Sequence, residues 1–249
     1  MIMLKSAAEL ELMHQANLLV HETLRVVTEA ARPGVSTEEL DTLAERHIRA
    51  RGGRPAFKGY RGFPATLCTS VNDVIVHGIP SADCVLKAGD IVSVDCGVVW
   101  QGYYGDAAVT VAVGNVPDEA RRLLEVTREC LEAAVGAVRP GGRVSDVGSA
   151  IQRHAEGHGF SVVREFVGHG IGRALHEEPQ VYNFGPPGRG AELRPGLVLA
   201  IEPMVNQGAA GVVVDADGWT ARTEDGKLSA HFEYSVAVTT NGPRILGMG

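Results

Sequence analysis

Two histidines spaced seven residues apart, His169 and His176, lie in a glycine-rich segment at residues 166–176. An imidazole can bind a metal ion or carry a proton, and glycine lets the backbone come close to another group. The segment therefore indicates a chemical site, whereas an isolated histidine elsewhere is more often solvated or simply hydrogen-bonded. Acidic residues in other parts of the chain favour the first interpretation.

Four carboxylic acids each adjoin an apolar or β-branched run that predicts a buried strand. Burying a carboxylate costs several kcal/mol unless the group is paired or coordinates a cation. Four such acids brought together would repel one another strongly in the absence of a metal ion. The four acids are Asp95, Asp106, Glu202 and Glu233.

A ligand set of carboxylate oxygens and one imidazole suits Mn²⁺, Fe²⁺ or Co²⁺, with Zn²⁺ also possible. Carboxylates that are shared between ions favour a two-metal centre, with the ions about 3.5–4 Å apart, which makes hydroxide from a bridging water at neutral pH. The four cysteines show no Cys-x-x-Cys spacing, so a thiolate-rich zinc site is not indicated.

The sequence repeats part of itself at an offset of 107 residues. Residues 32–34 align with 139–141, and residues 86–95 align with 193–202, so that Asp95 is equivalent to Glu202 in the alignment. With gaps, the His-Gly-Ile at 77–79 matches that at 169–171, and Asp106 matches Glu233. Several matches in the same order indicate an internal duplication. We therefore expect one catalytic domain over residues 1–249, built from pseudo-symmetric halves at roughly 1–115 and 116–249.

Helical and strand patterns alternate along both halves and predict an α+β fold. Capping-box pairs, proline-glycine stops and apolar periodicity predict two helices in each half, near residues 6–31, 36–52, 118–139 and 145–156. Strands are expected near 67–76, 91–94, 109–113, 161–166, 197–201 and 232–238, and a loop at 53–66. Pairing the halves about a pseudo-twofold axis would cover one face of a mainly antiparallel sheet with helices and gather the acids on the axis.

Composition excludes several other classes of protein. The chain is 45% hydrophobic and 21% charged, with no apolar run of the ~18–20 residues that span a bilayer. Its net charge is −7 without a run of Lys or Arg, so stable nucleic-acid binding is not expected. The N-terminal residues do not resemble a signal peptide, and four scattered cysteines suit reduced thiols, so we expect a cytoplasmic protein.

In these acidic and histidine motifs, the chain resembles the type I methionine aminopeptidases, which have the pita-bread metallopeptidase fold. The resemblance extends over essentially all 249 residues, and the ligand motifs occur in order. It implies that Asp95 binds one metal ion, that Asp106 and Glu233 bridge both, and that His169 and Glu202 bind the other.

The same resemblance implies roles in the reaction. His77 and His176 would contact the substrate, His176 at the scissile carbonyl and His77 at the amide nitrogen. Glu202, also a ligand, would carry the proton, and the hydroxide that bridges the metal ions would attack the carbonyl. The expected reaction is removal of the initiator methionine from nascent polypeptides, preferably before a small second residue.

The methionine pocket and a cation site also come from the resemblance. The pocket would be lined by Tyr60, Phe63, Cys68, Leu175 and Trp219. Some relatives carry Tyr in place of Phe63 and Phe in place of Leu175, which leaves the apolar character of the pocket unchanged. A monovalent cation is expected near Asn72, Val74 and Ser229.

Other functions remain to be distinguished. A peptidase for Xaa-Pro bonds shares the fold but usually carries a long N-terminal domain, and a type II methionine aminopeptidase carries a long insertion before its last glutamate. Only 30 residues separate Glu202 from Glu233, which favours type I. A non-catalytic binding module that keeps the fold is a different class, disfavoured because all five ligand positions are intact. We expect a monomer that makes at most transient contact with the ribosome and does not bind membranes.

Overall fold

Four α-helices form where the capping and stop signals predict them. The computed structural model describes residues 2–248. Both predicted capping boxes are present, Ser6 with Glu9 and Ser36 with Glu39. The helices are α1 Ala7–Ala30, α2 Thr37–Ala50, α3 Asp118–Ala137 and α4 Val144–Gly157. None of the helices in residues 2–248 is both long and apolar enough to cross a membrane.

The main sheet contains nine strands, and its paired strands run antiparallel. Its central path is β1-β4-β5-β14-β9-β7-β8, with β2 paired to β4 and β15 paired to β14. These strands are β1 Arg54–Pro55, β2 Leu67–Val71, β4 Ile91–Trp100, β5 Tyr103–Ala112, β7 Gly168–Gly170, β8 Glu177–Val181, β9 Val198–Ile201, β14 Glu233–Thr239 and β15 Gly242–Ile245. The α+β prediction is confirmed.

Two smaller three-stranded sheets complete the fold. One has the order β13-β10-β6 and the other β11-β12-β3. Their strands are β3 Val74–Val76, β6 Ser161–Val162, β10 Met204–Asn206, β11 Val212–Val214, β12 Ala221–Thr223 and β13 Ser229–His231. Most of these strands are three residues long, too short for an alternating pattern to identify them in the sequence.

Several predicted boundaries are wrong. The single strand expected at 67–76 is two strands in different sheets, because Asn72 takes a left-handed conformation with φ 55°. The strand at 161–166 stops after Val162. The expected loop at 53–66 contains β1 and a short 3-10 helix, η1 Tyr60–Gly62.

The β4–β5 hairpin is longer than predicted and forms the centre of the first half. Each strand is ten residues long, and a turn at Gln101 and Gly102, both with positive φ, joins them. Along β4, Val94 and Cys96 pack in the core beneath the helices of this half. Because successive side chains of a strand point to opposite faces, Asp95 lies on the other face of the sheet.

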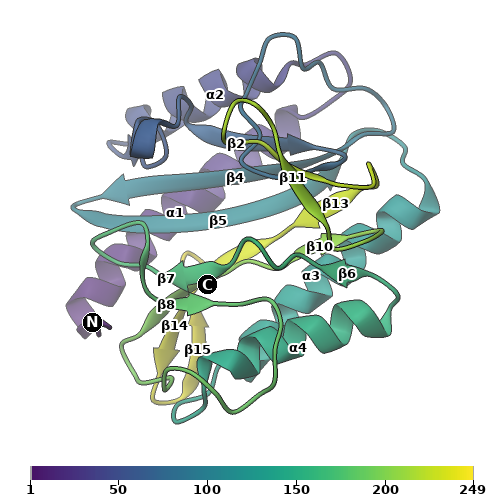
Figure 1. Ribbon diagram of the computed structural model, residues 1–249. Helices are drawn as coiled ribbons and strands as arrows, with labels where there is room; N and C mark the ends of the chain where they lie inside the picture. Colours follow the sequence, from purple (N-terminus) through teal and green to yellow (C-terminus); the bar gives the residue numbers. More distant parts are fainter. Residues whose placement is uncertain (1, 249) are drawn as a thin grey trace.

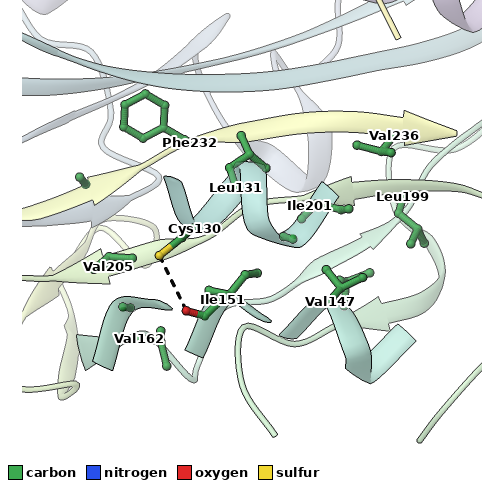
Figure 2. Packing of buried hydrophobic residues seen from close by; sticks show 14 of the residues in the cluster. Cys130, Leu131, Val147, Ile151, Val162, Leu199, Ile201, Val205, Phe232 and Val236 are labelled. Atoms are coloured by element: carbon green, nitrogen blue, oxygen red, sulfur yellow. Dashed lines mark hydrogen bonds between the residues drawn. The ribbon is translucent and has the colours of Figure 1, made fainter. Parts of the chain in front are cut away.

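The helices cover one face of the sheet, as predicted. Helix α1 packs on β4 and β5, while α3 contacts β14 and β9 as well as α4 (Figure 1). Figure 2 shows the core of the second half, where Leu131 and Ile151 of the helices meet Leu199 and Val236 of the sheet. The thiol of Cys130 donates to the carbonyl of Ile151 at 3.7 Å and links α3 to α4 (Figure 2).

The two halves repeat the same backbone hydrogen bonds at the offset of 107 residues. The amide of Gly34 donates to Leu86 at 2.9 Å, and the amide of Gly141 donates to Leu193 at 2.9 Å. Isolated bridges pair Ser36 with Val85 and Arg143 with Glu192, again at equivalent positions. These equivalent contacts extend the sequence repeat into three dimensions.

The half-sheets meet along a short seam between β5 and β14. Only two residue pairs connect these strands, Ala108 with Glu233 and Ala107 with Tyr234. By contrast, β4 and β5 are paired over ten positions. The acidic residue at the start of β14 therefore lies at the junction of the halves.

Candidate metal centre

Five neighbouring strands of the main sheet each supply one of the predicted metal ligands. Asp95 comes from β4, Asp106 from β5, Glu233 from β14, Glu202 from the residue after β9, and His169 from β7. The ligands are therefore far apart in sequence but follow the strand order across the seam between the halves. The pairing of Asp106 with Gly97 and of His169 with Ala200 fixes their positions along the strands.

The side chains of these residues converge at the centre of the sheet. Nε2 of His169 lies 3.6 Å from Oε1 of Glu202 and 4.0 Å from Oδ2 of Asp106. Donor atoms of Asp106, His169 and Glu233 lie within 4.8 Å of one another, and all three residues are buried. The structure thus brings the predicted ligands together at one place.

The imidazole of His169 is oriented for metal binding. Its Nδ1 lies 2.9 Å from the carbonyl of Gly170, so this nitrogen carries the proton and Nε2 keeps a lone pair toward the acids. Burial lowers the pKa of His169 to about 3, with His176 adding to the shift. A neutral ring with one free nitrogen is the form that binds metals.

The glycines on both sides of His169 are required by close packing of the backbone. A Cβ atom at Gly168 would lie 2.3 Å from the carbonyl oxygen of Ala200, on β9. At Gly170 it would lie 2.2 Å from the carbonyl oxygen of Glu178, on β8. The glycines let β7 fit between two strands and hold the imidazole at the sheet centre.

The carboxylates lack the partners that buried charges need. Among the residues described, buried oxygens of Asp95, Asp106 and Glu233 have no hydrogen-bond partner. Burial raises the pKa of Asp95 to about 7. Burial, and then the neighbouring acids, also raise the pKa values of Asp106, Glu202 and Glu233. Divalent cations would supply the missing partners, and the oxygen-rich donor set with one imidazole fits them.

Two buried groups that the sequence analysis missed hold the backbone of Asp106. The amide of Asp106 donates to Oδ1 of Asn17 at 3.2 Å, and Oγ of Ser235 donates to the carbonyl of Asp106 at 2.9 Å. Asn17 also donates to the carbonyl of Met13 at 2.9 Å within α1. The sequence did contain a signal for Asn17, because it is a polar residue on the apolar face of the first helix, where a buried amide needs hydrogen-bond partners.

A cavity of about 160 Å³ adjoins the ligands. All five residues expected in the methionine pocket line it, together with Phe57 and Arg61, which the sequence analysis did not identify. Phe63 and Trp219 meet edge to face with ring centroids 5.1 Å apart. Burial and the acids nearby raise the pKa of Cys68 well above its ordinary value, so it is a neutral thiol and not an activated nucleophile.

The two remaining predicted histidines also line this cavity. His176 stacks on Tyr60, whose hydroxyl lies 2.9 Å from Nδ1 of His176. His77 has φ 61°, a strained conformation for this residue type, and its ring packs edge-on against Phe166 and Trp219. Burial lowers the pKa values of both, that of His77 to about 4.

A third histidine, His231, had no role in the sequence analysis but lies next to the ligands. It is 2% exposed, and its Nε2 is 3.8 Å from Oε2 of Glu202. Burial lowers the pKa of His231 to about 3. Its backbone amide donates to Oγ1 of Thr110 at 2.9 Å, which fixes the end of β13 beside β5.

Residues of the expected monovalent-cation site are partly engaged with one another. The carbonyl of Asn72 accepts from the amide of Ser229 at 2.9 Å, and Oδ1 of Asn72 accepts from the amide of Ile91 at 3.0 Å. The hydroxyl of Ser229 donates to Oδ1 of Asn206 at 2.8 Å. Cation binding by Asn72, Val74 and Ser229 stays a prediction.

Known proteins share both the sequence and this fold. The model of metallopeptidase family M24 matches residues 11–240. A methionine aminopeptidase of Clostridium perfringens is 51% identical over 99% of this chain and 98% of its own length. The crystal structure of the methionine aminopeptidase from Thermotoga maritima superposes with a TM-score of 0.98 at 48% identity, with both chains fully covered.

A more distant likeness concerns the fold alone. The prolidase from Pyrococcus horikoshii has a TM-score of 0.80 at 22% identity, and the match covers 98% of this chain but 63% of the prolidase. The pita-bread fold expected from the sequence is therefore confirmed, with its curved antiparallel sheet and four helices. The chain belongs to metallopeptidase family M24 and, within that family, to the methionine aminopeptidases.

Proposed function

We propose that this enzyme removes the N-terminal methionine from nascent polypeptides, using two divalent metal ions held by the five ligands. One observation carries the proposal: the metal donors line the same cavity as a group of apolar side chains and a thiol. A metal centre beside a pocket for one side chain suits an exopeptidase that recognises the first residue of its substrate.

The ions would be held by Asp95, Asp106, His169, Glu202 and Glu233. Bound ions would supply Lewis-acid activation of the attacking water and of the scissile carbonyl. Mn²⁺, Fe²⁺ and Co²⁺ suit this donor set, and Zn²⁺ is also compatible with it.

The protein's own residues would bind and orient the substrate and move the protons. Oε1 of Glu202 is 3.6 Å from Nε2 of His169, so this carboxylate lies within the site and would accept a proton from the attacking water. His176, with Nδ1 facing the Tyr60 hydroxyl, would donate from its other nitrogen to the carbonyl oxygen. His77 would contact the amide nitrogen and assist its departure as an amine.

The pocket would bind the methionine side chain. Tyr60, Phe63 and Trp219 offer aromatic faces and edges, while Leu175 and Cys68 are almost fully buried. A flexible thioether packs well against aromatic rings and against a neutral thiol. Exclusion of water from this apolar surface would favour methionine over polar side chains.

In the cell we propose that the substrates are new N-termini with a small second residue, processed by a cytoplasmic monomer. Transient contact with the ribosome would bring the enzyme to these N-termini. The net charge of −7 argues against stable binding to the ribosomal RNA itself. A monovalent cation near Asn72, Val74 and Ser229 would add to the divalent ions.

The test is hydrolysis of two peptides, Met-Ala-Ser and Ala-Pro-Ala, by chelator-stripped protein to which Mn²⁺, Co²⁺ or Fe²⁺ is restored in turn. We expect release of methionine only, dependent on metal and lost in Asp106→Ala. The control is Asp118→Ala, which removes a carboxylate at the start of α3 that is 97% exposed and does not line the cavity, and it should keep full activity. Cleavage of Ala-Pro-Ala alone, or no cleavage with metal bound, would overturn the proposal.

A further inference from the structure

A second cluster of potential metal ligands lies between α3 and α4, outside the metal centre. Glu129 of α3 and His154 and His158 at the end of α4 have donor atoms within 4.8 Å of one another. Nε2 of His154 is 2.8 Å from Oε2 of Glu129. The residues are half-buried or exposed, so a cation could reach them from solvent.

The imidazole of His158 is held in the form that binds metals. Its Nδ1 lies 2.8 Å from the carbonyl of His154, so this nitrogen carries the proton and Nε2 has the free lone pair. The two rings lie side by side, with centroids 4.5 Å apart. Arg122 donates to the carbonyl of His158 at 3.0 Å and fixes the backbone at this helix end.

The first half of the molecule contains the same arrangement with one decisive difference. At the offset of 107 residues, Glu22 and His47 correspond to Glu129 and His154, while Arg51 corresponds to His158. Nη1 of Arg51 lies 3.3 Å from Oε2 of Glu22, which is also 3.8 Å from Nε2 of His47. A guanidinium donates hydrogen bonds but has no lone pair with which to bind a metal ion. The first-half cluster is therefore an ion pair and not a set of metal ligands.

The backbones at these two positions are nearly identical. Arg51 caps α2 with φ −90° and ψ 2°, and His158 caps α4 with φ −99° and ψ 4°. Each is followed by a glycine with positive φ, Gly52 at 81° and Gly159 at 82°. The duplicated scaffold therefore accepts either side chain, and the exchange of Arg for His changes the chemistry without changing the fold.

We propose that Glu129, His154 and His158 form a binding site for Zn²⁺ or a cation of similar preference. Two imidazoles and one carboxylate with an open position for water are ligands that suit Zn²⁺. Donor atoms on a tetrahedral zinc lie about 3.3 Å apart for bonds of about 2 Å, so small rotations of these accessible side chains close the site. The bound ion joins α3 to α4.

The test counts zinc by equilibrium dialysis of the purified wild-type protein against micromolar Zn²⁺, followed by metal analysis. His158→Arg should bind one Zn²⁺ fewer than the wild type and release methionine at the same rate with Mn²⁺. The matched control is His47→Ala, which removes the equivalent first-half histidine and should leave the zinc count unchanged. Equal zinc counts in the wild type and His158→Arg would overturn the proposal.

Two further measurements separate this site from the metal centre. In an Asp106→Asn background, where the metal centre is disabled, adding His158→Arg should still lower the zinc count by one. Imidazole ¹⁵N signals of His154 and His158 should shift as Zn²⁺ is added to the Asp106→Asn protein. Unmoved signals would overturn the proposal even if the metal centre behaves as described, and shifted signals would support it even if the centre proves inactive.

Discussion

The metal-free protein should become less stable as the pH rises from 6.5 to 8, the reverse of the usual behaviour of buried acids that are paired. Burial raises the pKa of Asp95 from 3.8 to about 7, so the folded state keeps a proton that the unfolded chain has already lost. Stability falls wherever the folded state binds more protons. The loss begins near pH 4 and is complete near pH 8, about one unit above the folded pKa.

Buried histidines act in the opposite direction at lower pH. Burial lowers the pKa values of His77, His169 and His231 to about 4, 3 and 3, so each stays neutral when folded. They add stability as the pH rises through their ordinary value of 6.5, and about 0.4 kcal/mol of this gain for each histidine still falls between pH 6.5 and 8. Above pH 6.5 the acids outweigh this remaining gain, because the raised pKa values of Asp106, Glu202 and Glu233 add their own loss to that of Asp95.

The magnitude follows from the pKa of Asp95. The rise in this pKa from 3.8 to about 7 corresponds to about 4 kcal/mol of folding stability that is lost as the pH increases. About 1 kcal/mol of that loss falls between pH 6.5 and 8. The raised pKa values of Asp106, Glu202 and Glu233 add to the loss. For a protein of this size, 1 kcal/mol lowers Tm by about 2–4 °C.

The assay is thermal unfolding of chelator-stripped protein at pH 6.5, 7.25 and 8, repeated with saturating Mn²⁺. We expect Tm to fall with pH in the metal-free protein and to hold steady or rise with Mn²⁺, because protons no longer compete for the ligands. Asp106→Asn should weaken the dependence in the metal-free protein. Asp217→Asn, which removes an exposed acid of lowered pKa, should leave the slope unchanged. A metal-free Tm that rises over this range would refute the reasoning.

Three substitutions test how the site is positioned. Asn17→Ala leaves the buried amide of Asp106 without an acceptor and should lower the free energy of unfolding by about 1–3 kcal/mol in a urea titration. Tyr60→Phe removes one hydrogen bond to His176, so kcat/KM for Met-Ala-Ser should fall about 5–10-fold with unchanged Mn²⁺ affinity. Gly170→Ala places a Cβ 2.2 Å from a carbonyl oxygen and should weaken Mn²⁺ binding at least tenfold, measured by calorimetry.

Each of these has a result that contradicts it. An unfolding free energy within about 0.5 kcal/mol of the wild type would show that Asn17 does not support Asp106. A Tyr60→Phe enzyme with wild-type kcat/KM would remove the role given to its hydroxyl. Wild-type Mn²⁺ affinity in Gly170→Ala would show that the close packing at Gly170 does not position His169. Its control is Gly136→Ala, where a Cβ meets nothing within 4 Å and Mn²⁺ affinity should stay unchanged.

The elements with strong local signals can be predicted from the sequence. The helices are predictable because Ser6 with Glu9, and Ser36 with Glu39, form capping boxes that act locally. The acids are predictable because burying an unpaired carboxylate beside a buried strand costs free energy, so its presence there indicates a bound cation or another partner. The internal duplication then predicts that these acids gather near one axis, since equivalent positions of the two halves supply them.

Other features depend on contacts between distant segments. The end of a strand at Asn72 has only a weak local signal, the turn-forming pair Asn72-Asp73, and the left-handed backbone of Asn72 is fixed by bonds to Asp90, Ile91 and Ser229. Likewise, Phe57 and Arg61 line the cavity only because the turn at η1 folds over it. His231 sits beside Glu202 through strand pairing that no spacing in the sequence reveals.

The two-residue seam between β5 and β14 has a mechanical consequence. Glu233 begins β14 on one side of the seam, and Asp106 lies on β5 on the other, so ions shared by these residues would act as a clamp between the half-sheets. Loss of the ions would then free the halves to open against each other while each keeps its own helices and core. Hydrogen exchange should show this as faster exchange at the amides of Ala108 and Glu233 in the metal-free protein, with little change elsewhere in the β4–β5 hairpin.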